Sequence, residues 1–319
     1  MVITSGFRPA WWLPSAHLQT IYPGLSRRRL RPELLRERVE LPDGDFIDLD
    51  WTQQSPGPIV LVLHGLEGSL ESHYTGGILT ALAAQGYRAV LMYFRGCSGE
   101  PNRLPRSYHS GETGDLHSII EHIQQRHPAT PVAIIGYSLG GNVLLKWLGE
   151  QGEKAPVKTA VAVSVPFELN RAARQLERGL SQIYQKYLLN RLRKSVTAKA
   201  PVHPPTVPLT QLAELKTFRR FDNAITAPLH GFRNVDDYYT RSSSRQYLQR
   251  IRIPALIIHA LDDPFLPADA IPSDEDLAPS VTLELSPHGG HVGFVAGNHP
   301  CKAQYWLESR ICERLREHL

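Results

Sequence analysis

Short runs of apolar residues alternate with longer amphipathic stretches along most of the chain. The apolar runs are continuous, which is typical of strands buried on both faces of a parallel sheet, and they lie at 58–63, 88–93, 131–135, 158–163, 255–259 and 281–285. Stretches with a helical pattern lie near 74–85, 113–126, 142–151 and 303–318. Because strand and helix alternate, the sequence predicts an α/β fold with a mostly parallel central sheet flanked by helices.

The segment 38–51 has a different pattern, in which apolar and polar residues alternate on either side of Asp43 and Gly44. An Asp-Gly pair tolerates the positive φ angles of a tight turn between two strands. We therefore expect an antiparallel β-hairpin near the start of the chain.

The alternation of strand and helix stops between 164 and 251. This stretch is rich in Arg and Lys, has a helical pattern at 180–192 and contains a proline-rich segment at 200–208. We expect residues 165–250 to form a helical cap inserted over the carboxyl edge of the sheet. Residues 1–164 and 251–319 together would then form one α/β core.

Composition narrows the class of protein. With 319 residues, 42% of them hydrophobic, the chain is too long and too apolar for a disordered protein or a small disulfide scaffold. Its formal net charge of +4 is too small to indicate nucleic-acid binding. Glu33 and Glu37 interrupt the densest basic run, so we expect a solvated face there and not a phosphate-binding patch. The arginines of this run are Arg27, Arg28, Arg29, Arg31, Arg36 and Arg38.

The cysteines and the apolar runs bear on the location of the protein. Cys97, Cys301 and Cys312 are odd in number and form no CxxC pair, so we expect a reducing compartment and neither a disulfide framework nor a zinc knuckle. The N-terminal residues lack the pattern of a secretory signal. The most apolar run, 59–63, is far shorter than the roughly 20 residues that cross a bilayer. The sequence thus predicts a cytoplasmic protein without an integral membrane segment, and it leaves the oligomeric state open.

The pentapeptide Gly136-Tyr137-Ser138-Leu139-Gly140 has the pattern GxSxG. Such a pattern also arises by chance, and it suits a purely structural glycine turn. Here an apolar strand runs directly into it and a helical stretch leads out of it, which is the context of a nucleophile elbow. The strained turn exposes the serine hydroxyl at the carboxyl edge of the sheet, so Ser138 is the candidate nucleophile.

A serine nucleophile needs a base and a carboxylate that orients the base, and in this fold they follow the serine in the order Asp or Glu, then His. Asp262 and Asp263 follow one predicted strand, and Asp263 is preferred because the Asp-Pro turn that it heads fixes its carboxylate. His288 and His291 follow the last predicted strand, and His291 is preferred because two glycines precede it. The structural alternatives are a turn or capping role for the aspartates and an exposed loop position for the histidines.

Two backbone amides are expected to hold the oxyanion of the tetrahedral intermediate. The turn at 64–68, HisGlyLeuGluGly, resembles the HGxxG loop of esterases, so the Leu66 amide is one candidate donor. The Leu139 amide, directly after the nucleophile, is the other.

Other chemistry is not indicated. His117 and His122 are five residues apart, so on a helix they diverge and do not share a metal ion. Neither GxGxxG nor GxxxxGK[ST] occurs where it would bind a nucleotide. We expect neither a metal nor an organic cofactor.

With these residues in place, the chain resembles the α/β-hydrolases and, more narrowly, the YheT-like branch of serine esterases, the AB hydrolase 4 type family. The resemblance extends from 17 to 294, and it implies an α/β-hydrolase core, esterase or lipase-like activity and no cofactor. It also implies that the second Asp of the Asp-Asp pair and the His of Gly-Gly-His, here Asp263 and His291, complete the triad. The matching stretches are 17–20 (HisLeuGlnThr), 64–68, 95–99 (ArgGlyCysSerGly), 108–111 (TyrHisSerGly) and a long pattern from 222 to 263.

The sequence therefore predicts a serine hydrolase that cleaves carboxylic esters of small molecules through an acyl-enzyme. Aromatic and leucine residues in the cap favour short to medium acyl chains, including lipid-derived ones, and Tyr137, Phe232 and Tyr239 are candidate substrate contacts. Such side chains also serve simply to pack a cap on its core. An acyltransferase with the same acyl-enzyme and a non-catalytic binding protein on a hydrolase scaffold are the alternatives. Peripheral contact with lipid stays open, and the middle of the cap, 191–213, has no assigned role.

Overall fold

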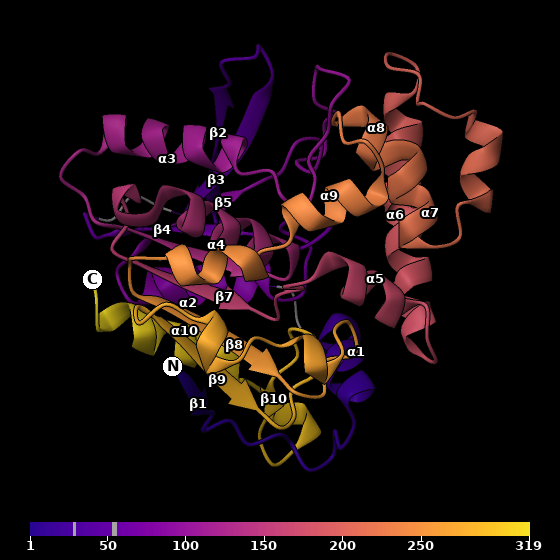
Figure 1. The fold of residues 1–319 in the computed structure, drawn as a ribbon. Helices are drawn as coiled ribbons and strands as arrows, with labels where there is room; N and C mark the ends of the chain where they lie inside the picture. Colours follow the sequence, from indigo (N-terminus) through magenta and orange to yellow (C-terminus); the bar gives the residue numbers. More distant parts are fainter. Residues whose placement is uncertain (28–29, 53–55) are drawn as a thin grey trace.

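The structure, a computed structural model, describes residues 1–27, 30–52 and 56–319. The strands of its main sheet are β1 (Val2–Thr4), β2 (Leu34–Glu40), β3 (Phe46–Thr52), β4 (Ile59–Leu63), β5 (Arg88–Met92), β6 (Val132–Tyr137), β7 (Thr159–Val163), β8 (Ala255–Ala260) and β9 (Val281–Ser286). They form a 9-stranded sheet in the order β1-β9-β8-β7-β6-β4-β5-β3-β2 (Figure 1). β3 pairs antiparallel with β2 and with β5, and the remaining pairs are parallel. The predicted mostly parallel sheet is confirmed.

Helices cover both faces of this sheet, which is why its central strands are apolar throughout. The flanking helices are α2 (Thr75–Ala84), α3 (Gly114–Arg126), α4 (Leu139–Gln151) and α10 (Trp306–Arg316). In β4, Ile59, Leu61 and Leu63 pack in one apolar cluster with α3 and α4, and Val60 and Val62 pack in another with α2 and α10. A strand that packs against apolar residues on both faces has no polar face, so its sequence is a continuous apolar run.

The predicted hairpin is formed by β2 and β3, with Gly44 at φ 83° in the turn. The described arginines of the basic run are matched by carboxylates. Across the hairpin, Arg38 Nε donates to Asp48 Oδ1 at 2.8 Å, and Arg36 pairs with Asp50. Arg31 pairs with Glu71 and Arg27 with Glu308. Arg28 and Arg29 lie outside the described residues.

Two elements near the N-terminus were not expected. β1 is short and has no clear periodicity, yet it pairs in parallel with β9 at the edge of the sheet. The helix α1 (Ala16–Ser26) begins after Ser15, whose hydroxyl accepts the Leu18 N–H at 3.2 Å. Both lie beside the C-terminal strands in Figure 1, so the two ends of the sequence meet at this edge.

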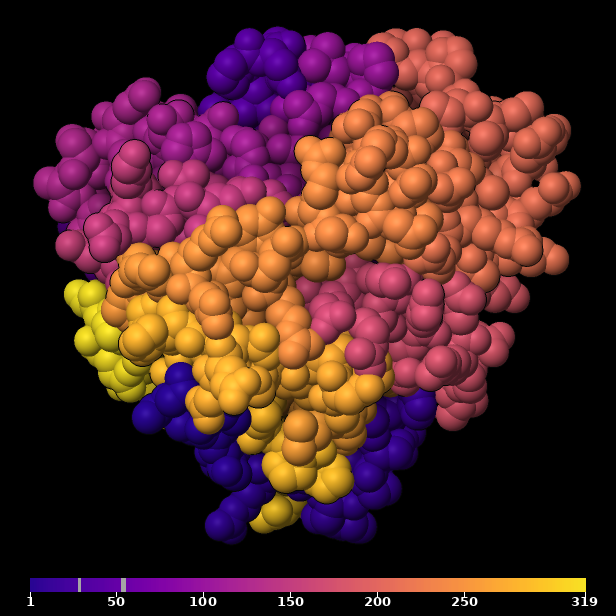
Figure 2. All heavy atoms as spheres, viewed as in Figure 1, coloured from indigo at the N-terminus to yellow at the C-terminus, as the bar shows by residue number. Residues whose placement is uncertain are grey.

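The segment between β7 and β8 is helical. Its helices are α5 (Leu169–Leu176), α6 (Ser181–Lys199), α7 (Phe218–Phe221), α8 (Ala227–Leu229) and α9 (Val235–Ser242), with 3-10 turns at Leu209–Glu214 and Arg245–Arg250 and a π turn at Asp222–Thr226. We call residues 165–250 the cap segment. It has an apolar cluster of its own, and its atoms, pink to orange in Figure 2, form most of the right side of the molecule in that view.

The predicted elements and the observed ones differ mainly at their ends. The helix predicted at 142–151 begins at Leu139, because the chain passes from β6 into α4 through a single residue. The helix predicted at 180–192 continues to Lys199 through a basic stretch without apolar periodicity. There Arg193 donates to the carbonyl oxygens of Leu212 and Leu215 at 2.8 and 2.9 Å. These hydrogen bonds to residues outside the helix stabilise this end of α6, although its sequence has no apolar periodicity.

The remaining elements are short. They are β10 (Val295–Ala296) and β11 (Gln304–Tyr305), with 3-10 turns at Gly152–Lys154, Ala268–Ala270, Asp274–Asp276 and Pro300–Lys302. None of the helices in the described ranges combines the length and the apolarity needed to cross a bilayer.

Candidate active site

Ser138 lies between β6 and α4 with φ 51° and ψ −116°, a backbone conformation that residues other than glycine rarely adopt. The glycines around it permit the sharp turn. A Cβ atom on Gly136 would lie 2.5 Å from the Gly140 carbonyl oxygen, and one on Gly140 would lie 2.6 Å from the carbonyl oxygens of Leu63 and His64. The elbow therefore depends on close backbone contact between α4 and the ends of two strands.

The structure brings Ser138, His291 and Asp263 into one hydrogen-bonded chain. His291 Nε2 lies 2.9 Å from Ser138 Oγ. On its other side, His291 Nδ1 lies 2.8 Å from Asp263 Oδ2 and 3.1 Å from Oδ1. Since Asp263 accepts at Nδ1, that nitrogen carries the ring proton and Nε2 is free to accept the serine proton.

The imidazole of His291 is also held from its flat face. The ring of Phe265 stacks on it, with centroids 3.8 Å apart and planes 2° from parallel. The Phe265 N–H donates to Asp263 Oδ1 at 2.8 Å, so the same residue orients the carboxylate. His259 Nε2 lies 4.0 Å from Asp263 Oδ2, but burial lowers the pKa of His259 to about 4. His259 is therefore neutral at pH 7 and places no positive charge beside Asp263.

The neighbouring pair, Asp262 and His288, faces solvent. Asp262 Oδ2 lies 3.3 Å from His288 Nδ1, and the His288 side chain is 58% exposed. Asp262 Oδ1 accepts the Gly290 N–H at 2.9 Å. This pair braces the loop that carries His291 and does not reach Ser138.

The turn at 64–68 presents the Leu66 amide. Gly68 N–H donates to the Gly65 carbonyl at 2.9 Å, which closes the turn, and the Tyr74 hydroxyl accepts the Gly65 N–H at 2.8 Å. His64 is fully buried below it, with Nδ1 donating to the Gly65 carbonyl at 2.7 Å and Nε2 accepting the Phe94 N–H at 3.1 Å. Burial lowers the pKa of His64 to about 4, so the ring is neutral and acts as a structural support.

A cavity of about 380 Å³ opens beside these amides, between the core and the cap segment. Leu66 and Leu139 line it from the core, and Leu192, Phe218 and Tyr238 line it from the cap segment. Polar and charged residues, among them Glu67, Lys199 and His230, also line it, so the cavity is mixed in character and has the size of a small-molecule site.

The motif at 17–20 braces the loop of the histidine, a role that sequence reasoning did not assign to it. The Thr20 hydroxyl accepts the His291 N–H at 2.9 Å, and Gln19 Oε1 accepts the Val295 N–H at 2.7 Å. His17 Nδ1 lies 2.9 Å from the hydroxyl of Tyr184 in the cap segment. The motif was visible in the sequence, but its role was not. Its hydrogen-bond partners lie more than 150 positions away along the chain.

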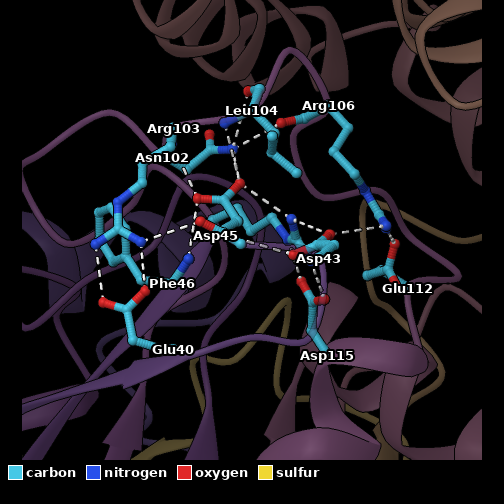
Figure 3. Close-up of polar contacts among 12 residues, drawn as sticks. Glu40, Asp43, Asp45, Phe46, Asn102, Arg103, Leu104, Arg106, Glu112 and Asp115 are labelled. Carbon is cyan, nitrogen blue, oxygen red and sulfur yellow. Dashed lines mark hydrogen bonds and ion pairs between the residues drawn. The ribbon is translucent and has the colours of Figure 1, made fainter.

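A polar network anchors the loop 101–112, which forms one wall of the cavity (Figure 3). Asp45 Oδ2 accepts from Asn102 Nδ2 at 2.5 Å, and Asp45 Oδ1 accepts the Arg103 N–H at 2.9 Å. Burial by itself raises the pKa of Asp45, but these hydrogen bonds outweigh it and hold the pKa below its usual value. At the other end of the network, Arg106 pairs with Glu112. Both ends of the loop are thus fixed to charged groups.

Within the described ranges, His109, Glu112 and His230 bring potential metal-binding atoms within 4.8 Å of one another. Burial lowers the pKa of both histidines to about 3, so both are neutral at pH 7. However, the Gly111 N–H donates to His109 Nδ1 at 3.1 Å, which places the ring proton on Nε2, the atom that faces Glu112. A protonated ring nitrogen has no lone pair for a metal ion, so this arrangement argues against a metal site.

The three residues expected to contact substrate lie at different depths. Tyr137 is 1% exposed and stacks on Tyr74 with centroids 4.2 Å apart. The hydroxyl of Tyr239 donates to Asp222 Oδ2 at 2.7 Å. Phe232 packs edge-on against His109 at 5.2 Å. None of the three is among the described residues that line the cavity.

Comparisons with known proteins show the family of the chain. The sequence pattern of the family described as "alpha/beta hydrolase fold" matches residues 58–297. The Escherichia coli (strain K12) protein named "Putative esterase YheT" is 46% identical over 321 residues, which cover 98% of this chain and 94% of that protein. Phospholipase ABHD3 of Mus musculus is 32% identical, over 95% of this chain and 77% of its own length.

Two further similarities are more distant. Monoacylglycerol lipase of Saccharomyces cerevisiae (strain ATCC 204508 / S288c) is 28% identical, over 81% of this chain and 59% of its own length. Among solved structures, the Pyrococcus furiosus esterase Pf2001 superimposes with a TM-score of 0.61 at 18% identity, covering 90% of this chain and 91% of that one. At that identity the likeness concerns the fold alone.

Proposed function

We propose, from the premise that the chain belongs to the α/β-hydrolase family and to its YheT-like branch, that it is a serine esterase acting on small-molecule carboxylic esters. The observation that carries the proposal is the hydrogen-bonded chain from Ser138 through His291 to Asp263. The relatives named esterase, phospholipase and monoacylglycerol lipase support ester hydrolysis as the class of reaction.

The reaction proceeds in two halves. Ser138 Oγ attacks the ester carbonyl carbon while His291 Nε2 takes the serine proton, and Asp263 stabilises the imidazolium. The amides of Leu66 and Leu139 donate to the oxyanion. His291 then returns the proton to the leaving alkoxide, the carbon–oxygen bond breaks, and the acyl group stays on Ser138. Water repeats the sequence, with His291 as base, and releases the carboxylic acid.

We assign the acyl group to the cavity beside Leu66 and Leu139. Its volume of about 380 Å³ is near the lower end of small-molecule sites, which favours short to medium acyl chains. Tyr238 lines this cavity, and Phe232 and Tyr239 each pack against Tyr238 with ring centroids 5.2 Å apart. We therefore propose that Phe232 and Tyr239 shape the substrate site from behind, as Tyr137 does below the nucleophile.

The natural ester and the compartment are also part of the proposal. The names of the phospholipase and lipase relatives favour a lipid-derived ester, which peripheral contact with a lipid surface would supply. Cys97, Cys301 and Cys312 are free thiols, which fits a reducing, cytoplasmic location.

Hydrolysis of p-nitrophenyl esters from acetate to palmitate by the wild type and by Ser138→Ala tests the function. We expect the variant to lose at least about 10³-fold in kcat/KM, because the nucleophile is removed. A fluorophosphonate should label the wild type once and the variant not at all, as read by intact mass. Ser273→Ala, at an exposed serine, is the matched control and should keep both properties.

The chain-length optimum of the wild type measures the acyl site. A folded wild type that neither hydrolyses the esters nor takes the label would contradict the proposal and favour a binding protein on the hydrolase scaffold. Product analysis with an added alcohol separates hydrolysis from acyl transfer.

A further inference from the structure

Glu67, which follows the oxyanion residue Leu66, has an unusual backbone conformation. It lies at φ 52° in the third position of the turn closed by Gly65 and Gly68. Glycine or asparagine normally occupies this position when φ is positive. A glutamate in the left-handed region persists only where its surroundings hold it there.

Hydrogen bonds from two different parts of the molecule hold Glu67. Its N–H donates to the Tyr108 hydroxyl at 2.7 Å, and that hydroxyl donates in turn to Glu67 Oε1 at 2.9 Å. The hydroxyl of Ser195, on helix α6 of the cap segment, donates to Glu67 Oε2. The residue is 8% exposed, so a lost donor would leave a buried carboxylate oxygen without its partner.

The same helix contacts the opposite half of the site. Near the start of α6, the Ser181 hydroxyl donates to the Pro264 carbonyl at 2.8 Å, directly after Asp263. Tyr184 packs on Phe265 at 5.0 Å, and Phe265 is the ring stacked on His291. In Figure 1, α6 is the long helix that runs the height of the cap segment. One cap helix is thus bonded to the acid–base side and to the oxyanion side of the catalytic centre.

We propose that Glu67 is a positioning residue through which the cap segment sets the oxyanion hole. With α6 in place, Ser195 and Tyr108 hold the Glu67 carboxylate, the turn keeps its left-handed residue, and the adjacent Leu66 amide points to the oxyanion. If α6 moves away, the turn loses one of these restraints, and the amide loses its direction. The cap segment then controls the chemical step as well as substrate binding. This inference rests on the proposed esterase function.

The simpler alternative is that α6 only packs on Leu66, whose side chain also contacts the apolar cluster of the cap segment. The two roles differ in what they do to the transition state. Packing changes stability and KM, whereas a misdirected amide weakens binding of the oxyanion and lowers kcat.

The experiment compares Ser195→Ala, Ser195→Thr and Glu67→Gln with the wild type. For Ser195→Ala we expect kcat to fall about tenfold, with KM changed by less than about twofold, since full loss of an oxyanion donor costs about 10²–10³ and here the donor is only misdirected. Ser195→Thr keeps the hydroxyl and should restore kcat. Glu67→Gln keeps the size of the side chain but removes the carboxylate. Its kcat should fall at least as far as that of Ser195→Ala. Thr197→Ala is the control, because this exposed residue lies on the same helix, two positions after Ser195, and is not among the described residues that line the cavity.

A trifluoromethyl ketone, which adds to Ser138 and places an oxyanion in the hole, gives the second readout. Its affinity should fall by the same factor as kcat in Ser195→Ala and Glu67→Gln and stay unchanged in Thr197→Ala. If folded Ser195→Ala has a normal kcat, or if only its KM changes, the inference is overturned while the esterase function stands. A wild type without Ser138-dependent hydrolysis overturns both. If Ser195→Ala does not fold, Glu67→Gln and Ser195→Thr decide by the same two readouts.

Discussion

Asp262 and Asp263 are chemically identical neighbours that the fold directs to different partners. Asp263 is buried, accepts from His291 and is fixed by the Phe265 amide. Asp262 points to the solvent side and supports the loop at Gly290. The two carboxylates leave the turn after β8 in different directions, so Asp263 contacts His291 while Asp262 contacts the loop at Gly290.

We therefore expect Asp263→Asn to lower kcat by about 10⁴-fold, because the amide no longer holds the His291 tautomer in which Nε2 is free. Asp262→Asn should stay within about threefold of the wild type, since it contacts neither Ser138 nor His291 Nδ1. Steady-state kinetics with p-nitrophenyl acetate measures both. Equal losses in the two variants would contradict the assignment of the acid.

At the scale of elements, the junction of β6 and α4 is the critical part. The helix starts directly after the candidate nucleophile, so its first amide is that of Leu139, the proposed oxyanion donor. This start is possible because Gly140 lets α4 approach the backbone at the end of β4. The position needs a small residue for reasons of space, since both nearest contacts are backbone carbonyl oxygens that cannot rotate away.

Gly140→Ala should lower the free energy of unfolding by about 2 kcal/mol, as is typical of overpacking at a site with no room. It should also reduce kcat, because α4 must shift and carries Leu139 with it. Gly24→Ala, in the last turn of α1, is the matched control, since nothing lies within 4 Å of its added Cβ. We expect it to raise stability by about 0.5–1 kcal/mol through helix propensity. Urea unfolding measures both, and a stable, active Gly140→Ala would refute this view of the elbow.

At the scale of the whole molecule, the fold buries histidines that must stay neutral. His64 and His259 are both fully buried, and burial lowers the pKa of each from its usual 6.5 to about 4. Between pH 6.5 and pH 4 each of these histidines binds a proton in the unfolded chain but not in the native protein. The free energy of unfolding therefore falls as the pH is lowered from about 6.5 to about 4. Above 6.5 both states are neutral and the native protein has its full stability.

His259→Gln isolates one of these contributions. From pH 7 to pH 5 the wild type should lose about 2 kcal/mol more unfolding free energy than the variant, as expected for a pKa that falls from 6.5 to about 4. Urea unfolding at both pH values gives this difference, and the carboxylates common to both proteins cancel. Parallel curves for the two proteins would show that His259 titrates alike in the native and unfolded states.

Much of the fold can be predicted from the sequence because its determinants are local. A strand buried on both faces must be apolar along its whole length, and a hairpin turn needs a residue that tolerates positive φ, so the order of strands and helices can be inferred directly. The candidate triad is predicted in the same way, since each of its residues follows an expected strand end. The exceptions are β1, α1 and the basic end of α6, which have no local pattern and form because distant parts of the chain bind them.

The sequence by itself determined the kind of element at most positions, the parallel sheet and the identity of the candidate nucleophile, base and acid. Only the tertiary structure decided that Thr20 braces His291, that Phe265 stacks on it, and that Ser195 of the cap segment reaches Glu67. The physical reason is distance along the chain. A periodic pattern or a turn motif expresses the preferences of a few neighbouring residues, whereas each of these contacts joins segments that meet only when the sheet and the cap segment have packed.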